Sequence, residues 1–374
     1  MTAMAMSCRP DLIIFDEPTT ALDVTTQIEV LAAIKDVVRQ FNTAAIYITH
    51  DLAVVAQMAD RIMVLRHGNL IEEGKAADIL YHPKKDYTRA LLAVRSYRKD
   101  GEVPSETEKP LLTIKGVHAA YSPTAKVLHG IDLKIRRGQT VAVVGESGSG
   151  KSTLARAITG LLPPDKGQIL FQGEELPLDI AHRTKDQLRH LQMIYQMPDT
   201  ALNPKHTVGD IIGRPLTFYL GMKGRVRERR VAELLDMIEM TPEYASRLPD
   251  ELSGGQKQRV CIARALAAEP ELIICDEVTS ALDQLVAEEI LKLLQRLQDD
   301  LGVTYLFITH DLATVKAIAD EIVVMLDGRV IEHGSKAKVL APPHHEYTEL
   351  LLSSVPKMDP NWLMDVLESR RQAL

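Results

Sequence analysis

Hydrophobic residues along the chain fall into short runs that alternate with polar, helix-like stretches. Segments 111–121 and 127–135 alternate apolar and polar residues, which predicts two antiparallel strands with one buried face. The runs at 140–144 and 272–276 are apolar almost throughout, which is typical of strands buried on both faces. Helical spacing follows the first of these runs at once and resumes at about 285–297. This alternation predicts an α/β domain with a mostly parallel sheet that binds ligands at the carboxyl ends of its strands.

The chain contains an internal repeat with a constant offset. Asp276 lies 260 positions after Asp16 (276 − 16), and His310 lies at the same offset from His50. The segment 46–55 agrees with its counterpart at seven of ten positions, and no gap is needed. Two copies of one domain are therefore predicted.

The first copy corresponds only to the rear part of the second. At the offset of the repeat Met1 aligns with Cys261, so everything before Cys261 in the second copy has no counterpart in the first. The first copy would then lack the central strand of its sheet, and we expect part of a hydrophobic sheet edge to be exposed. The predicted segments are half a domain at 1–95, a linker at 96–110, a complete domain at 111–334 and a C-terminal extension at 335–374. The linker is inferred because its residues are charged or turn-forming.

Composition narrows the class of function. The net charge of −7 gives no general attraction to nucleic acid, and 4% aromatic residues do not favour stacking on single strands. The three cysteines have no metal-ligand spacing. No apolar run approaches the roughly 18 residues of a membrane-spanning helix. If the protein serves a membrane, we expect a peripheral subunit.

The segment GESGSGKST follows one predicted strand and opens a predicted helix. This is the context that the phosphate-loop pattern G-x-x-x-x-G-K-[ST] requires, because its backbone N–H groups and the helix N-terminus then face phosphates. Lys151 would reach the β- and γ-phosphates, and the Ser152 hydroxyl would ligate Mg²⁺. The predicted nucleotide-binding residues here are Gly145, Glu146, Ser147, Gly148, Ser149, Gly150, Lys151, Ser152 and Thr153. A glycine-rich turn that binds nothing is the alternative, and the surrounding strand and helix disfavour it.

The strand at 272–276 ends in an acidic pair. Asp276 would hold Mg²⁺, and Glu277 could accept a proton from an attacking water. A lone Asp-Glu pair is usually an exposed turn. Its position after a buried strand and downstream of a phosphate loop favours the catalytic interpretation.

The segment LSGGQKQR at 252–259 closely resembles the signature sequence of ATP-binding-cassette (ABC) ATPases. The resemblance covers nearly the whole chain and implies a P-loop NTPase: a RecA-like core with an antiparallel β subdomain and a helical subdomain. It implies ATP and Mg²⁺ as cofactors. It also implies that each ATP lies between the phosphate loop of one cassette and the signature of another, so that one chain alone makes no complete site. The nucleotide contacts implied outside the phosphate loop are Tyr121, Ser253, Gly254, Gly255, Gln256 and Asp283.

Further roles follow from the same resemblance. Tyr121 matches the aromatic residue that stacks on adenine, and Gln196 matches the glutamine that senses Mg²⁺ and the transport partner. His310 matches the histidine that steadies the γ-phosphate. Alternatives remain for single residues, because an isolated tyrosine is usually packed at a sheet edge and a single histidine can be purely structural. One departure is Val278, where the family usually has proline.

The segment TALNP at 200–204 and the related stretches 81–92 and 341–352 resemble importers of oligopeptides, dipeptides and nickel. The resemblance implies an ATPase subunit at the cytoplasmic face of the bacterial inner membrane. Its implied partners are two permeases, a second cassette and, indirectly, an extracytoplasmic binding protein. Two alternatives stay open: a soluble ABC ATPase acting on ribosomes or DNA, and an inactive product whose first half is only a scaffold.

Overall fold

The computed structural model describes residues 2–19, 22–93 and 109–372. The chain divides into two compact units, each described by itself below. The first unit consists of Met1–Tyr97, Asp283–Leu285 and Glu346–Leu374, and the second of Arg98–Leu282 and Val286–His345. The predicted linker at 96–110 lies outside the described residues except for its last two positions.

A four-stranded antiparallel sheet in the second unit confirms the strands predicted from alternation. Its order is β6-β5-β8-β9. The strands are β5 (Leu112–Ser122), β6 (Ala125–Ile135), β8 (Lys166–Phe171) and β9 (Glu174–Glu175). Leu112, Ile114 and Val117 of β5 are buried, as the alternating pattern requires.

A six-stranded sheet forms the centre of the second unit, in the order β10-β11-β12-β7-β13-β14. The strands are β7 (Thr140–Val144), β10 (Leu191–Ile194), β11 (Leu272–Asp276), β12 (Thr304–Ile308), β13 (Glu321–Leu326) and β14 (Arg329–Ser335). All neighbours are parallel except β13 and β14. The strands β7, β11 and β12 are buried along their whole length, because both faces of the sheet are covered. Their carboxyl ends bring the phosphate loop, the acidic pair and His310 to one edge.

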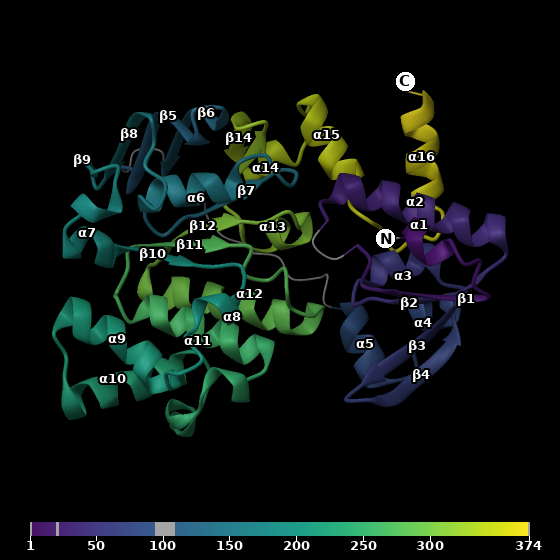
Figure 1. The fold of residues 1–374 in the computed structure, drawn as a ribbon, viewed down its shortest axis with the longest axis horizontal. Coiled ribbons are helices and arrows are strands. Elements are labelled where there is room, and N and C mark those ends of the chain that lie inside the picture. The colour runs from purple at the N-terminus through teal and green to yellow at the C-terminus, as the bar shows by residue number, and fades with distance from the viewer. Residues whose placement is uncertain (1, 20–21, 94–108, 373–374) are drawn as a thin grey trace. The chain divides into compact units, whose positions relative to one another are not determined.

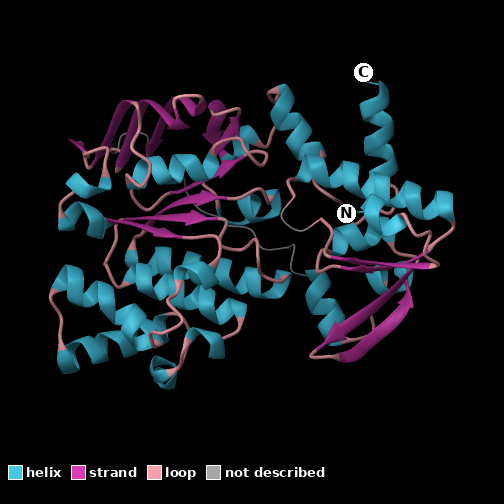
Figure 2. Cartoon of the chain, viewed as in Figure 1, coloured by secondary structure: helices cyan, strands magenta, loops and turns pink. Residues whose placement is uncertain are grey.

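Helices cover both faces of this sheet. The helix α6 (Lys151–Thr159) lies between the two sheets, where Leu154 and Ile158 join a core cluster with residues of both (Figure 1). A helical layer lies on the opposite face, as Figure 2 shows. It includes α8 (Pro198–Ala201), α9 (Val208–Leu220), α10 (Gly224–Met237), α11 (Gly254–Leu266) and α12 (Gln284–Leu301). The remaining helices of the unit are α7 (Lys185–His190), α13 (Leu312–Ile318) and α14 (Lys336–Val339).

The first unit contains two separate two-stranded sheets. Its strands are β1 (Leu12–Asp16), β2 (Ala44–Ile48), β3 (Arg61–Arg66) and β4 (Asn69–Lys75). Its helices are α1 (Thr2–Met6), α2 (Val24–Phe41), α3 (Leu52–Met58), α4 (Ala76–Tyr81), α5 (Asp86–Ala93), α15 (Glu346–Ser353) and α16 (Trp362–Gln372). In the second unit β7 joins β12 to β13, and the described part of the first unit has no equivalent strand between β2 and β3.

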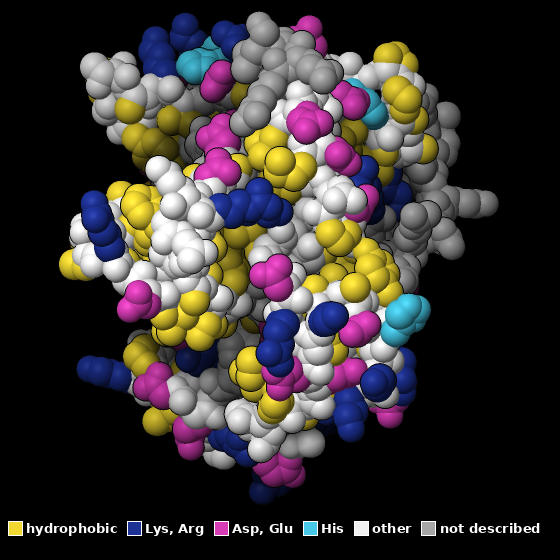
Figure 3. All heavy atoms as spheres, turned by 90° about the vertical axis from the view of Figure 1, so that its right-hand side faces the viewer, with side chains coloured by type: hydrophobic (Ala, Val, Ile, Leu, Met, Phe, Trp, Pro, Cys, Tyr) yellow, Lys and Arg dark blue, Asp and Glu magenta, His cyan; other side chains and the backbone are white. Residues whose placement is uncertain are grey.

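One face of the β1–β2 sheet is apolar and exposed. Leu12, Ile14, Ile46 and Ile48 are 47–60% exposed. Their counterparts in the second copy, each at 0% exposure, are Leu272, Ile274, Leu306 and Ile308. In the second unit this face packs in the core cluster that contains α6. Figure 3 faces the first unit and shows hydrophobic side chains open at the surface between charged ones. The sequence predicted an exposed sheet edge where the central strand is missing, and the exposed face of the β1–β2 sheet is a separate finding of the structure.

Candidate nucleotide-binding site

The phosphate loop runs from the end of β7 to the start of α6, and its glycines occupy conformations that other residues avoid. Gly145 has φ +152°, and a Cβ there would lie 2.2 Å from the carbonyl oxygen of Met325. Gly150 has φ +101° and caps the N-terminus of α6. A side chain at either position would push the loop away from its neighbours. The loop conformation therefore depends on these two glycines.

Lys151 and Ser149 are two buried polar side chains of this loop. The Lys151 side chain is buried, and its Nζ donates to the carbonyl oxygens of Gly145 (2.8 Å) and Glu146 (2.7 Å). The ammonium group is thereby held within the loop at the N-terminus of α6. The Ser149 hydroxyl is buried and has no hydrogen-bond partner among the described residues. A phosphate oxygen would satisfy such a group, which fits the predicted ligand.

Ser152 and Asp276 meet at the base of the loop. The Ser152 hydroxyl donates to Asp276 Oδ1 at 3.0 Å. Burial raises the pKa of Asp276, and the hydrogen bond from Ser152 opposes that shift only in part. The sequence analysis predicts both residues as Mg²⁺ ligands, and the structure brings their side chains into contact. Hydroxyl and carboxylate oxygens are the hard donors that this ion prefers.

Glu277 stands between two of its predicted partners. Gln196, just after β10, donates from Nε2 to Glu277 Oε2 at 2.7 Å, and His310 Nδ1, just after β12, lies 3.3 Å from Oε1. The backbone of Glu277 has φ +51°, and its N–H donates to the carbonyl of Ile308 at 2.9 Å. This strained turn directs the carboxylate toward the other two side chains.

The two titratable groups favour each other's charged forms. Burial alone would raise the pKa of Glu277, but the hydrogen bond from His310 and the nearby positive charges outweigh it and lower that pKa. The hydrogen bond to Glu277 raises the pKa of His310 despite the burial of the ring. An ionised Glu277 is the form that a proton acceptor requires.

Tyr121 lies beside α6, and the residue is half exposed, at 52%. Arg156 donates to the Tyr121 hydroxyl at 3.0 Å, and Thr153 Oγ1 lies 3.4 Å from the same oxygen. The ring is therefore held in place while the residue remains half exposed, as stacking on a base would require. The sequence interpretation missed Arg156, which lies five residues after Lys151 on the same helix and whose pairing with Tyr121 no local pattern specifies.

The signature residues are not brought to the phosphate loop of their own unit. Ser253 caps α11, and its Oγ accepts from the Gln256 N–H at 3.3 Å. Gln256 donates from Nε2 to the Tyr244 hydroxyl at 3.0 Å. The helices α11 and α6 cover opposite faces of the sheet (Figure 1). Gly254 and Gly255 open α11, and Asp283 lies in the short segment that groups with the first unit.

The first unit repeats part of this geometry. Glu17 has φ +44°, its N–H donates to the Ile48 carbonyl at 2.9 Å, and His50 Nδ1 lies 3.0 Å from its Oε1. Asp16 precedes it as Asp276 precedes Glu277, but Asp16 is exposed. The acid–histidine pair thus occurs twice in the chain, and the phosphate loop occurs once in the described residues.

Comparison with known proteins identifies the family. The model of the ABC transporter family matches residues 128–280, and that of the oligopeptide/dipeptide transporter C-terminal region matches residues 331–373. The glutathione import ATP-binding protein GsiA of Escherichia coli (strain K12) is 38% identical over 396 aligned positions, which cover 96% of this chain. The chain belongs to the ABC transporter family. The protein of the same name from Shigella flexneri gives the same identity and coverage.

The extent of these matches differs between relatives and solved structures. The alignment spans 64% of the length of GsiA, so this ABC chain corresponds to a little under two thirds of that relative. CbiO1 from Clostridium perfringens, part of the ABC transporter complex CbiONQ, matches with a TM-score of 0.55 and 32% identity. That match covers 62% of this chain and 91% of CbiO1.

A second structure bears on the ligand. The ATP-binding cassette MJ0796, in a dimeric post-hydrolysis state with ADP and Pi, matches with a TM-score of 0.55 and 33% identity. The match covers 60% of this chain and 98% of that cassette. These matches confirm the P-loop NTPase fold and ATP with Mg²⁺ as the cofactors of the family. Among the described residues no group of three or more His, Cys, Asp or Glu side chains could hold a metal ion.

Proposed function

We propose that this ABC protein binds and hydrolyses ATP in its second unit and thereby powers import of peptides or related small solutes through partner permeases. The observation that carries the proposal is the cluster at one sheet edge, where a phosphate-loop lysine, a Ser–Asp pair and a Gln–Glu–His group meet. Neither alternative function, action on ribosomes or DNA or a purely structural role, receives support from the comparisons.

Each residue of the cluster has a role in this proposal. Lys151 and the loop N–H groups bind the β- and γ-phosphates, and Tyr121 stacks on adenine. Glu277 accepts the proton of the attacking water, and His310 holds both Glu277 and the γ-phosphate in position. Ser152, Asp276 and Gln196 would hold Mg²⁺, whose charge offsets that developing on the phosphates. Because the residues that would hold the metal, the phosphate loop and the proposed base all lie within one unit, only the opposing signature would have to come from elsewhere.

We infer that the site is completed by a second cassette. Ser253, Gly254, Gly255 and Gln256 would contact the ATP of a partner cassette, and Asp283 would lie at the same interface. The support is geometric, since these residues do not contact the phosphate loop of their own unit. A homodimer or heterodimer would supply two reciprocal sites.

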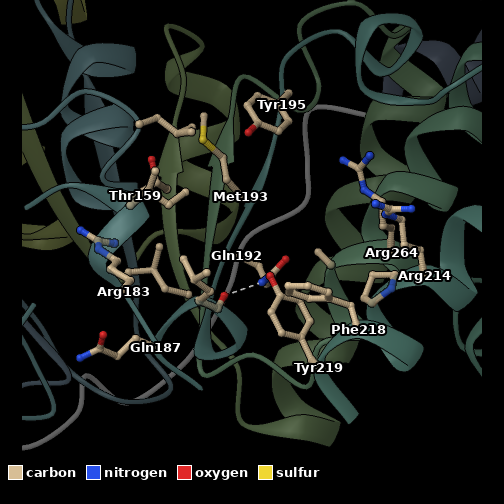
Figure 4. Close-up of a pocket in the computed structure, with 16 residues that line it drawn as sticks. Thr159, Arg183, Gln187, Gln192, Met193, Tyr195, Arg214, Phe218, Tyr219 and Arg264 are labelled. Carbon is tan, nitrogen blue, oxygen red and sulfur yellow. Dashed lines mark hydrogen bonds between the residues drawn. The ribbon is translucent and has the colours of Figure 1, made fainter. Parts of the chain in front are cut away.

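A pocket close to Gln196 fits the coupling to a permease. It has a volume of about 420 Å³ and lies between β10, α7 and the helical layer. Figure 4 shows Tyr195, Phe218 and Tyr219 along it, together with arginines that include Arg183. Burial lowers the pKa of Arg183 to about 10, and its Nη2 has no partner among the described residues. An apolar partner segment with an acidic group would match this lining.

The membrane assignment belongs to the same proposal. No helix in the described part of the chain is long and apolar enough to cross a membrane. We place the protein at the cytoplasmic face of the bacterial inner membrane, bound to two permease subunits that receive solute from an extracytoplasmic binding protein. The name of GsiA suggests glutathione as one member of the substrate class.

The repeat supplies a matched test of the catalytic assignment. Glu277→Gln keeps the size of the side chain but removes the proton acceptor, so steady-state ATP hydrolysis should fall by about 10²- to 10⁴-fold while ATP binding persists. Glu17→Gln makes the same change in the acid–histidine pair of the first unit and should leave the rate unchanged. Wild-type turnover by the Glu277 variant would refute the assigned base. Equal losses in both variants would show that hydrolysis does not reside in the second unit alone.

A further inference from the structure

The last two helices follow the second copy in the sequence, yet they group with the first unit. In α16, Trp362 and Leu363 are buried against Ile28, Leu31 and Val54 of α2 and α3. Trp362 is 4% exposed and Leu363 is 0% exposed. A large aromatic side chain is thereby removed from water by residues that precede it by more than 300 positions.

Gln57 holds the start of α16 through three hydrogen bonds. Its Nε2 donates to the carbonyl oxygens of Lys357 (2.8 Å) and Asp359 (2.6 Å), and its Oε1 accepts from the Leu363 N–H at 3.1 Å. Leu363 lies in the first turn of α16, where backbone N–H groups have no partner within the helix. Gln57 is 4% exposed, so its side chain, instead of water, satisfies these backbone groups at the start of α16. Tyr81 adds a fourth bond, from its hydroxyl to the Met358 carbonyl at 3.1 Å.

We call Ile28, Leu31, Val54 and Gln57 the first-copy seat. At the offset of the repeat, three of these four positions carry a different kind of side chain in the second copy. The differing pairs are Ile28 and Glu288, Val54 and Thr314, and Gln57 and Ala317. Val54 lies within the segment 46–55, where the two copies agree at seven of ten positions, so this seat position differs although its neighbours are retained. Ile28 and Gln57 lie outside that segment.

The second copy is unsuited to the same helix. Glu288 pairs with Lys292 at 2.7 Å, and the Thr314 hydroxyl donates to Asp311 at 2.7 Å. Trp362 would there meet the charged, partly buried Glu288 in place of the apolar Ile28, and Ala317 offers no side-chain groups to bind the backbone before α16. The polar positions of the second copy therefore disfavour the contact that the first copy makes.

We propose that α16 is a selective clasp, which recognises the first copy through the first-copy seat and does not bind the second copy. The C-terminal region is thus an interaction element specific for one of two homologous surfaces. Its recognition combines an apolar site for Trp362 with a glutamine that binds the backbone leading into the helix. This inference does not depend on ATP hydrolysis.

Hydrogen exchange at the start of α16 tests the polar half of the clasp. In the full chain, Gln57→Ala removes three hydrogen bonds, which should lower the docked-to-undocked ratio by roughly 100-fold and speed exchange of residues 357–367 to match. Ala317→Gln is the control at the equivalent position of the second copy and should leave exchange unchanged. Protection within about threefold of wild type in the Gln57 variant would overturn the proposal.

Fluorescence tests the apolar half, because Trp362 is the single tryptophan of the chain. The double variant Ile28→Glu, Val54→Thr gives the first copy the residues of the second, and it should shift emission to the red and increase quenching by acrylamide. Met364→Ala, at an exposed position of α16, should change neither quantity. Unchanged helix content by circular dichroism distinguishes undocking from unfolding. Wild-type emission and quenching in the double variant would show that the seat does not select the helix.

Discussion

Replacement of Lys151 by alanine should weaken ATP binding by an amount that the structure allows us to estimate. In the free protein Nζ makes two hydrogen bonds to loop carbonyls, at 2.8 and 2.7 Å. When a triphosphate enters, the ammonium group can form two charge-assisted bonds to phosphate oxygens, each contributing about 1.5–3 kcal/mol. The carbonyl bonds are given up in exchange, so about half of the sum remains. A net loss of about 2 kcal/mol corresponds to a roughly 30-fold rise in Kd.

The assay is titration of the full chain with ATP and Mg²⁺ by calorimetry at one fixed salt concentration. Lys134→Ala is the control, because it removes the same charge from an exposed position on β6. That control should bind ATP as the wild type does, which separates the specific contact from a change in net charge. Thermal melting of both variants shows whether the fold is retained. A Lys151 variant that folds and binds within about threefold of wild type would refute the assigned phosphate contact.

Two further predictions concern acid stability and cysteine reactivity. Glu321 pairs with His333 at 2.9 Å, and the hydrogen bond from His333 is the largest cause of its lowered pKa. Because the pKa of Glu321 is lower in the folded protein than in the unfolded chain, where it is near 4.5, the ionised carboxylate stabilises the fold at pH values above 4.5. This stabilisation is lost as the pH falls through the pKa of the folded protein. Glu321→Gln should therefore lower the free energy of unfolding by about 1–3 kcal/mol at neutral pH and by much less in strong acid, as urea unfolding at both pH values would show. An equal decrease at both pH values would contradict this pH dependence. Cys8 is exposed, whereas Cys261 and Cys275 are buried. Burial raises the pKa of Cys261 to about 11 and that of Cys275 still further. An alkylating reagent should therefore modify one cysteine of the native protein and all three of the urea-unfolded protein, as mass spectrometry would show. More than one modified cysteine in the native protein would contradict this.

Sequence reasoning predicted the parts of the site that short segments specify by themselves. The phosphate loop was predictable because glycine spacing, the lysine and the flanking strand and helix together define one backbone conformation. Asp276 and Glu277 were predictable because a buried strand must deliver them to the same sheet edge. The sequence predicted only an exposed sheet edge in the first copy, and the structure adds an exposed face, since Leu12 and Ile14 correspond to residues that pack in the core with α6 in the second unit.

Contacts between distant segments were not predictable in this way. Arg156 binds the Tyr121 hydroxyl across 35 positions, and no local pattern specifies that pairing. The docking of α16 was also missed, because Trp362 at the end of the chain gives no sign of which copy will bury it. It depends on Gln57, an ordinary helical residue in the sequence, whose three backbone bonds appear only once the chain is folded.

The acid–histidine pair of the first unit has a consequence for how the second site works. Glu17 and Glu277 share a left-handed backbone, with φ +44° and +51°, and their histidines lie 3.0 and 3.3 Å away. The described part of the first unit contains no phosphate loop, so this geometry arises without one. In the proposed function, the carboxylate that accepts the proton would therefore be positioned by folding, before any nucleotide binds. The binding energy of ATP would then be available for the proposed joining of two cassettes.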